Sequence, residues 1–252
     1  MSFYHLPKKS LGQNFLKDEY VLEQISLSMT TAPGFHPGLQ IVEIGPGLGD
    51  LTKHLLKIAP LRAIELDSSL LPQLRKRFLG FKLELIEADA LALLREQKLC
   101  EKPYWLCANL PYYAASAMLL ELLKDPLCKG FCALIQREVA LRFIGSNFCA
   151  LSVLAEAFAD VEILFDVDAK CFSPQPKVIS SLLRGVKKDC ELDYDALAAF
   201  LKIFFKSPRK QLKAVLPHLP AELLSKRPAE LDVKLILDIF KKDEYERGNS
   251  TK

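Results

Sequence analysis

The chain has 252 residues, of which 50% are hydrophobic and 26% are charged, and its net charge is +3 at pH 7. This balance is typical of a globular protein and excludes a disordered, collagen-like or coiled-coil chain. The charge is too small to indicate a nucleic-acid partner without knowing where it is concentrated.

No apolar run is long enough for a membrane span, and residues 1–14 lack the apolar core of a secretory signal. The seven cysteines and four histidines show no zinc-binding spacing. We therefore expect free thiols, a reducing cytoplasm, no membrane partner and no structural metal.

The first expected helix follows Asp18, a good N-cap, and continues with Val21, Leu22, Ile25 and Met29 at helical spacing. From residue 40 onward, short apolar strands alternate with helical patterns. The strands are expected over residues 40–44, 61–66, 81–86, 104–108 and 131–136, and the helices from residue 50 and over 67–79, 114–123, 138–143 and 151–159. This alternation predicts an α/β fold with a parallel, Rossmann-like open sheet.

Two further strands are expected over residues 161–167 and 178–183. Because the proline-rich connection between them is too short for a crossover helix, this terminal pair should form an antiparallel hairpin. Helices are expected beyond it, over residues 196–205, 208–216 and 233–240. We therefore expect an α/β domain over residues 1–188 and a small C-terminal helical domain over residues 189–252.

Polar residues follow the expected strands, at the sheet edge where ligands bind. Gly45, Gly47 and Gly49 allow the backbone to approach a ligand closely. Glu65, twenty residues after Gly45, can accept hydrogen bonds from ribose hydroxyls, and Asp89 can accept one from an adenine amine. Together they predict a pocket for an adenosine-containing cofactor, whereas the glycines alone are also compatible with a tight strand-to-helix turn.

Asp50 bears on the identity of this cofactor. A dinucleotide fingerprint has glycine at this position, and a carboxylate there would oppose a pyrophosphate at the helix N-terminus. S-adenosylmethionine carries no phosphate, and its sulfonium and ammonium cations suit Glu43 and Asp50. The sequence therefore favours S-adenosylmethionine over a nicotinamide cofactor.

The segment Asn109–Tyr112, directly after the fourth strand, suits methylation of an exocyclic amine on a base. The Asn109 side-chain oxygen and the Leu110 carbonyl can each accept an N–H bond from that amine, which aims its lone pair at a methyl group. Pro111 fixes the loop, and Tyr112 can stack on the base. Such catalysis relies on positioning and electrostatics. The alternative is a capped loop with a buried tyrosine.

Several motifs of the sequence, in their order along the chain, resemble those of the bacterial 16S rRNA adenine N6,N6-dimethyltransferase family. The resemblance is carried by residues 11–16 (LGQNFL), 42–49 (VEIGPGLG), 64–67 (IELD), 89–90 (DA), 109–112 (NLPY), 136–140 (QREVA) and 172–178 (FSPQPKV). It implies a class I methyltransferase that uses S-adenosylmethionine to dimethylate two adjacent adenosines near the 3′ end of 16S rRNA. The implied partner is the 30S subunit during ribosome biogenesis, and the implied enzyme is cytoplasmic and monomeric.

The resemblance also implies roles for individual residues. Asn14 and Leu16 would close over the methionine end of the cofactor, and Asn109 would contact both cofactor and target amine. Phe172 would stack on an extruded adenine from the side opposite Tyr112, although a core position is the alternative for this aromatic residue. The cofactor itself would be held by Gly45, Gly47, Glu65 and Asp89.

Positive charge is concentrated between residues 202 and 227, where seven basic residues accompany one acidic residue. The expected helix over residues 208–216 would place Arg209, Lys210 and Lys213 on one face. Together with Lys206, these residues form the expected contact with the RNA backbone, and a solvated surface is the alternative.

The sequence departs from the family pattern at three places, and two alternative functions remain. Tyr113 stands where the family often has Asn, residues 148–150 (FCA) differ, and the basic stretch 209–213 (RKQLK) is a variant of the usual run, which leaves details of RNA contact open. The alternative functions are a 23S rRNA adenine methyltransferase of the macrolide-resistance type and a non-enzymatic nucleic-acid-binding relative. The complete Asn109–Tyr112 segment is evidence against the non-enzymatic alternative.

Overall fold

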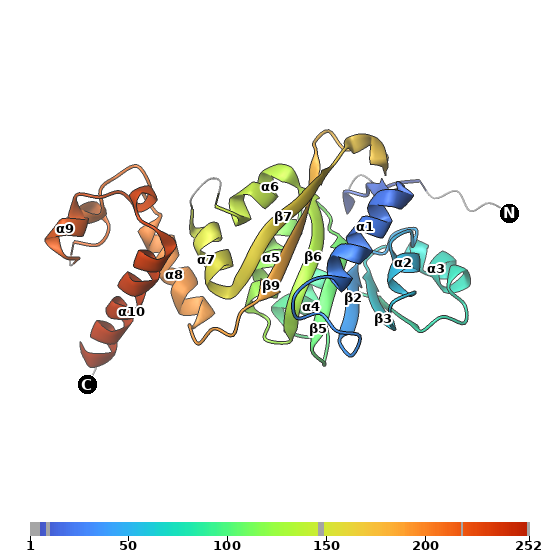
Figure 1. The fold of residues 1–252 in the computed structure, drawn as a ribbon, viewed down its shortest axis with the longest axis horizontal. Coiled ribbons are helices and arrows are strands. Elements are labelled where there is room, and N and C mark those ends of the chain that lie inside the picture. Colours follow the sequence, from blue (N-terminus) through green and yellow to red (C-terminus); the bar gives the residue numbers. More distant parts are fainter. Residues whose placement is uncertain (1–5, 9–10, 146–148, 218, 251–252) are drawn as a thin grey trace. The chain divides into compact units, whose positions relative to one another are not determined.

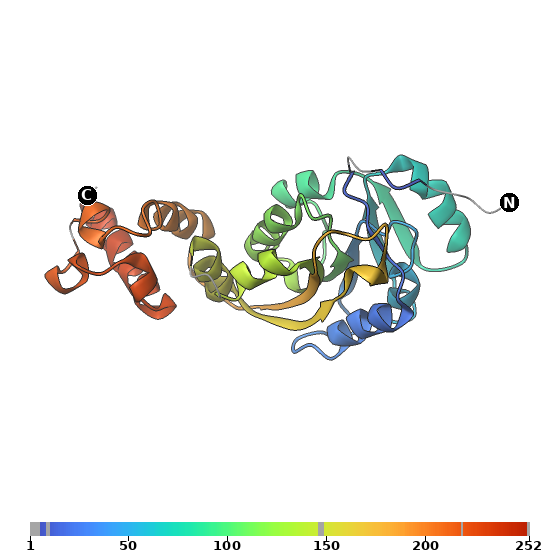
Figure 2. The same cartoon turned by 90° about the horizontal axis from the view of Figure 1, so that it is seen from above.

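Seven strands form the central sheet of the computed structural model, which describes residues 6–8, 11–145, 149–217 and 219–250 (Figures 1 and 2). The strands are β2 (Gln40–Ile44), β3 (Leu61–Glu65), β4 (Leu83–Glu87), β5 (Tyr104–Asn109), β6 (Cys128–Gln136), β7 (Ala159–Val167) and β9 (Ser180–Lys187). Their order is β4-β3-β2-β5-β6-β9-β7. The first five are parallel, and β9 pairs antiparallel with both β6 and β7. The expected parallel sheet with an antiparallel terminal hairpin is thus confirmed.

Helices cover both faces of this sheet. The helix α1 (Glu19–Thr30) lies on one face, and α4 (Ala90–Arg95) and α5 (Ala115–Lys124) lie on the other (Figure 2). The remaining helices of this region are α2 (Thr52–Leu55), α3 (Leu71–Arg77) and α6 (Arg137–Phe143). In the ranges that the structure describes, no helix is long and apolar enough to cross a membrane.

Local hydrogen bonds explain where α1 and α4 begin. The Asp18 side chain accepts a 3.0 Å bond from the Val21 N–H and caps α1, as expected. Asp89 caps α4 in the same way, because its side chain accepts a 2.8 Å bond from the Leu91 N–H. The sequence did not predict α4, since six residues are too few to show a helical period.

Two very short strands were also missed. The strand β1 (Phe15–Leu16) pairs antiparallel with β8 (Phe172–Ser173), so that Leu16 lies opposite Phe172. Strands of two residues have no alternation from which they could be predicted. The pair brings the segment before α1 next to the segment before β9.

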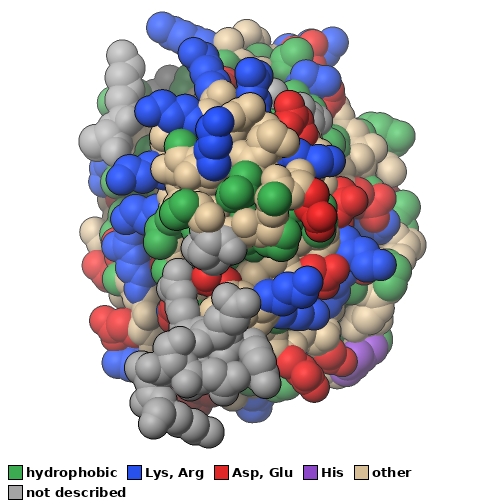
Figure 3. Space-filling view, turned by 90° about the vertical axis from the view of Figure 1, so that its left-hand side faces the viewer, with side chains coloured by type: hydrophobic (Ala, Val, Ile, Leu, Met, Phe, Trp, Pro, Cys, Tyr) green, Lys and Arg blue, Asp and Glu red, His purple; other side chains and the backbone are tan. Residues whose placement is uncertain are grey.

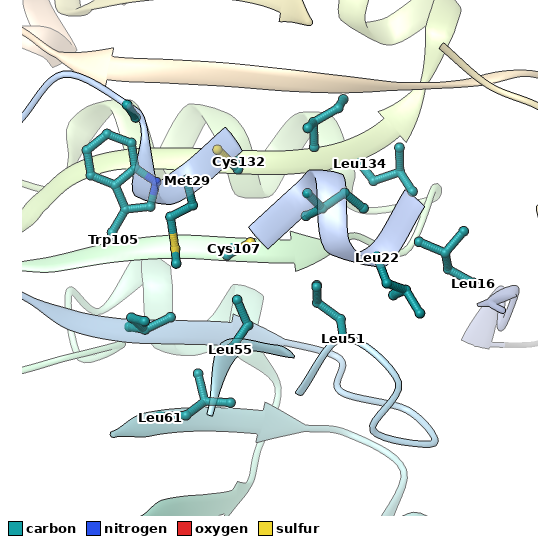
Figure 4. Packing of buried hydrophobic residues seen from close by; sticks show 14 of the residues in the cluster. Leu16, Leu22, Met29, Leu51, Leu55, Leu61, Trp105, Cys107, Cys132 and Leu134 are labelled. Carbon is teal, nitrogen blue, oxygen red and sulfur yellow. The ribbon is translucent and has the colours of Figure 1, made fainter. Parts of the chain in front are cut away.

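The hydrophobic core beside the sheet is built largely around α1 (Figure 4). Leu22 and Met29 of this helix are almost fully buried. They belong to one cluster with Trp105, Cys107 and Cys132 of the neighbouring strands β5 and β6. Burying these side chains supplies the main favourable free energy for holding α1 on the sheet.

The chain divides into two compact units, one of residues 1–141 and 159–187 and the other of residues 142–158 and 188–252. The second unit contains α7 (Ala150–Phe158), α8 (Tyr194–Phe204), α9 (Ala221–Leu224) and α10 (Val233–Ser250). In its core, Phe200 lies against Phe240, with ring centroids 5.4 Å apart. The last boundary between the two units lies between residues 187 and 188. The helix α7 precedes β7 in the chain but belongs to the same unit as the C-terminal helices.

The expected helix over residues 208–216 is wrong. In that range the structure has only a 3₁₀ turn, Leu212–Ala214. The Leu212 N–H donates to the carbonyl of Lys226 at 2.8 Å, whereas an α-helix would require the carbonyl of Pro208. Arg209, Lys210 and Lys213 consequently do not share a helix face.

Candidate active site

A cavity of about 750 Å³, open to solvent, lies at the carboxyl ends of β2, β3, β4 and β5. Nine of the residues predicted from sequence line it: Asn14, Gly45, Gly47, Glu65, Asp89, Asn109, Leu110, Pro111 and Tyr112. The sheet topology therefore gathers side chains from distant parts of the sequence around one space.

The glycine loop after β2 forms one wall of the cavity. Gly45 has a φ of +67°, and a Cβ atom placed there would meet nothing within 4 Å. A Cβ atom on Gly47 would instead lie 2.9 Å from the Phe15 ring, and one on Gly49 would lie 2.6 Å from the Phe78 ring. Gly45 thus keeps space open for a ligand, while Gly47 and Gly49 make room for aromatic side chains.

Glu65 joins the end of β3 to the glycine loop. Its carboxylate is buried and accepts hydrogen bonds from the backbone N–H groups of Gly47 at 3.0 Å and Asp67 at 2.8 Å. Burial raises the pKa of Glu65, and these two bonds act in the opposite direction. Each oxygen keeps a second lone pair that can accept a bond from a ligand hydroxyl.

Asn109 and Tyr112 are held in place by hydrogen bonds to other segments. The Asn109 Nδ2 atom donates to the carbonyl oxygen of Asn14 at 3.0 Å. The Tyr112 hydroxyl lies 2.6 Å from the Ser180 Oγ atom, and burial raises the pKa of the Tyr112 phenol. These bonds leave the amide oxygen of Asn109 and the face of the Tyr112 ring free of these partners and able to contact a ligand.

The N-terminal segment Leu11–Phe15 also lines the cavity, and sequence reasoning had assigned only Asn14 to the site from this stretch. Asp67 anchors the segment: it accepts bonds from Lys8 Nζ at 2.5 Å and Gln13 Nε2 at 2.8 Å. Burial tends to raise the pKa of Asp67, but the bonds from Lys8, Ser69 and Gln13 hold it well below its usual range. Four further lining residues were not predicted: Leu11, Gly12, Gln13 and Phe15. They belong to the motif of residues 11–16, and the motif pattern does not reveal what each of its residues does.

Leu16 and Phe172 do not belong to the described lining of the cavity. They are 4% and 3% exposed and lie in the hydrophobic core with Val167. Successive residues of a strand face opposite sides, so Phe15 points towards the cavity while Leu16 is directed into the core. The Phe172 side chain therefore lies in the core, which was the alternative to stacking on a base, and its ring is not exposed.

Glu43 and Asp50 were expected to face the cofactor cation, and this expectation is wrong. Glu43 is buried and accepts a 2.7 Å bond from the Thr52 hydroxyl, and burial raises its pKa to about 8. Asp50 forms ion pairs with Lys17 at 2.5 Å and Arg77 at 3.1 Å. Neither carboxylate is among the described residues around the cavity.

Basic side chains are exposed in the second unit. Lys206, Arg209, Lys210 and Lys213 are all exposed, and none of them forms a salt bridge with another residue that the structure describes. On the face drawn in Figure 3, Lys and Arg side chains gather in the upper and left part of the view. Of the sequence departures noted above, Phe148 lies outside the described residues.

Comparisons with known proteins agree with this arrangement. The family model described as ribosomal RNA adenine dimethylase matches residues 4–236. The ribosomal RNA small subunit methyltransferase A of Campylobacter curvus is 42% identical, and the alignment covers 97% of this chain and 95% of the relative. The protein of the same name from Helicobacter pylori strain HPAG1 is 43% identical over 81% of each chain.

Two solved structures are similar to the chain. A dimethyladenosine transferase from Plasmodium falciparum has a TM-score of 0.80 and 25% identity, and covers 93% of this chain and 98% of its own. The 23S rRNA methyltransferase ErmE has a TM-score of 0.75 and 24% identity, over 90% and 98% of the two chains. The second similarity concerns the fold alone.

Proposed function

Because the chain belongs to the ribosomal RNA adenine dimethylase family, we propose that it methylates N6 of two adjacent adenosines near the 3′ end of 16S rRNA. The methyl donor is S-adenosylmethionine, and the reaction belongs to small-subunit biogenesis. The curated relatives described above are named as small-subunit enzymes, which favours 16S over 23S rRNA. The complete Asn109–Tyr112 loop favours an enzyme over a non-enzymatic nucleic-acid-binding protein.

The observation that carries this proposal is the meeting of Gly45, Glu65, Asp89 and Asn109 around one cavity. The open space at Gly45 admits a ligand close to the backbone, and the Glu65 carboxylate is oriented by two backbone bonds. We assign Glu65 to the ribose and Asp89 to the adenine amine of S-adenosylmethionine. When bound, this cofactor supplies an electrophilic methyl group.

The loop after β5 positions the target base. The Asn109 amide nitrogen is engaged by Asn14, so its oxygen is available to accept a bond from the adenine amine. Leu110 is fixed by the 3.1 Å bond from its N–H to the Leu134 carbonyl, and its own carbonyl is the second acceptor. Tyr112, held by Ser180, stacks on the extruded base. The chain needs no strong base, because the amine proton can leave after methyl transfer.

We propose that the second unit contributes the RNA-binding surface through Lys206, Arg209, Lys210 and Lys213. Their exposure supports contact with phosphates, which requires charge but no helix. On this proposal, residues 1–188 form the methyltransferase domain, apart from α7, which groups with the C-terminal helices, and residues 189–252 form the RNA-binding domain. The enzyme would act as a cytoplasmic monomer on the 30S subunit.

The test is methyl transfer from labelled S-adenosylmethionine to immature 30S particles, 50S subunits and protein-free 16S rRNA, with the modified bases mapped. We expect two neighbouring dimethyladenosines near the 3′ end of 16S rRNA, formed most efficiently in the 30S particle. Asn109→Ala is the inactive control. Methylation confined to 50S subunits would contradict the 16S assignment, and the absence of any methyl transfer would contradict the enzymatic proposal.

A further inference from the structure

Tyr113 lines the same cavity but has no part in the chemistry proposed above. Its side chain is 64% exposed, whereas the adjacent Tyr112 is half-buried and bonded to Ser180. An exposed aromatic ring at the edge of a small-molecule cavity presents a large apolar face that a bound ligand can cover.

The Tyr113 ring lies beside the N-terminal segment at Gly12. A Cβ atom built on Gly12 would lie 3.4 Å from Tyr113 Cδ1, in van der Waals contact with the ring. Gly12 has a φ of +60°, a backbone conformation that favours glycine. The loop after β5 and the N-terminal segment therefore meet at the Gly12–Tyr113 contact.

This contact lies between the anchors of the N-terminal segment. Before Gly12 in the chain, Lys8 is bonded to Asp67, which follows β3, and after Gly12 the Gln13 side chain is bonded to the same carboxylate. The Asn14 carbonyl, also after Gly12, accepts a bond from Asn109. Because residues 11–15 line the cavity, their position decides how closely the cavity is covered.

Tyr113 lines the cavity together with Asp89 and Glu65. Partial burial raises the pKa of Tyr113, and the negative charges of Asp89 and Glu65 raise it further. These are the two carboxylates assigned above to adenine and ribose. Tyr113 therefore shares its part of the cavity lining with the two carboxylates assigned to the adenosine.

We propose that Tyr113 is a positioning residue that covers the adenosine half of the cofactor and, through Gly12, holds the N-terminal segment closed over it. This inference rests on the proposed use of S-adenosylmethionine. The flat ring provides apolar contact with the adenosine at a small cost in side-chain entropy. Tyr113 thereby slows release of the cofactor while the RNA target is positioned.

The experiment compares Tyr113→Asn, Tyr113→Phe and a matched control, Tyr20→Asn. Tyr20 lies on α1, is 70% exposed and is absent from the described lining of the cavity. Calorimetric titration with S-adenosylmethionine and with its demethylated product, S-adenosylhomocysteine, gives the affinities. We expect Tyr113→Asn to weaken both by the same factor, about three- to tenfold, as for loss of an aromatic contact. Tyr113→Phe should restore affinity to within about twofold, and Tyr20→Asn should leave it unchanged.

Gly12→Ala tests the contact from its other side. An alanine is strained at the φ of +60° found at Gly12, which would shift the segment beside the ring, so this variant should also weaken cofactor binding. If the two residues act through one contact, Gly12→Ala combined with Tyr113→Asn should weaken binding by less than the product of the separate effects. Independent, multiplicative effects would overturn the role of the contact.

Steady-state kinetics on 30S particles supply a second readout. The KM for S-adenosylmethionine should rise in Tyr113→Asn by a larger factor than kcat falls. Unchanged cofactor affinity with a raised KM for the 30S particle would overturn the inference and assign the ring to RNA. A loss of affinity for S-adenosylmethionine alone would also overturn it, because the ring would then face the sulfonium. Failure of the wild-type protein to bind either compound would instead refute the proposed function itself.

Discussion

The side chain of Asn109 donates a 3.0 Å hydrogen bond to the backbone carbonyl of Asn14, 95 residues earlier in the chain. Because the Nδ2 atom is engaged there, the orientation of the amide is set, and its oxygen remains to accept a bond from a base. One side chain thus links the segment that covers the cavity to the loop that positions the target.

Replacing Asn109 by Ala should lower the rate of methyl transfer about 10²–10³-fold, as for loss of one preorganised polar contact at a reacting centre. Binding of the ribosomal particle should barely change, because phosphate contacts provide most of that affinity. Single-turnover kinetics at saturating cofactor measure the rate. A rate within a few-fold of wild type would show that Asn109 does not position the amine.

Glu65→Ala should weaken binding of S-adenosylmethionine by about 1.5–3 kcal/mol, the usual contribution of hydrogen bonds to a charged group. Calorimetry with the purified protein measures this change. Glu65→Gln is the matched control, since it preserves the shape of the side chain and one acceptor oxygen, and it should lose less affinity. Equal affinity in wild type and Glu65→Ala, or tight binding of NAD by wild type, would contradict the assignment.

The buried carboxyl of Glu43 should make the stability of the protein depend on pH. Burial raises its pKa to about 8, against 4.5 for an ordinary glutamate. Between these values the folded protein keeps a proton that the unfolded chain releases, so stability falls as pH rises. The contribution is at most about 1.4 kcal/mol per pH unit.

Glu43→Gln removes this titration while preserving a partner for Thr52. The variant should therefore gain stability relative to wild type as pH rises from 5 to 8. Urea denaturation of both proteins across that pH range measures the difference between their free energies of unfolding. The contributions of all other carboxylates are the same in both proteins and cancel in this difference. Parallel pH dependences would mean that Glu43 titrates normally.

Replacing Arg209, Lys210 and Lys213 together by Gln should weaken binding to the 30S subunit. Each phosphate contact contributes about 0.7–0.9 to the slope of log affinity against log salt concentration, so that slope should become shallower by about two to three. Binding assays at several salt concentrations provide the slopes. Cofactor affinity is the internal control and should be unchanged, because the cavity is lined by residues of the first unit. Equal salt slopes would show that these residues form a solvated surface.

Much of the sheet could be predicted because its strands are short apolar runs separated by loops. The hairpin of β7 and β9 followed from the length of their connection, which excludes a crossover helix. The helix α4 could not be predicted, since its six residues depend on capping by Asp89 rather than on a periodic apolar face. The error over residues 208–216 has a tertiary cause: the bond between the Leu212 N–H and the distant Lys226 carbonyl replaces the helical bond.

The site was predictable where a residue type follows a strand end, as for Gly45, Glu65, Asp89 and Asn109. Prediction failed where the orientation of a side chain decides its role. Glu43 is only two residues from Gly45, yet it faces Thr52 in the interior. Phe172 is directed into the core by the pairing of two strands that no sequence pattern indicated. Tyr113 was noted only as a departure, because its contact with Gly12 exists only in three dimensions.

The second unit is assembled from two separate stretches of chain, and this limits how the protein can be dissected. The helix α7 buries Leu151, Leu154 and Phe158, and the Phe158 ring lies 5.2 Å from that of Tyr194 on α8. Ending the chain at residue 187 would leave α7 attached without the helices that it packs against in this unit. The shortened protein would expose an apolar strip and should self-associate. Excising both stretches, with a linker between residues 141 and 159, is the cut that follows the architecture.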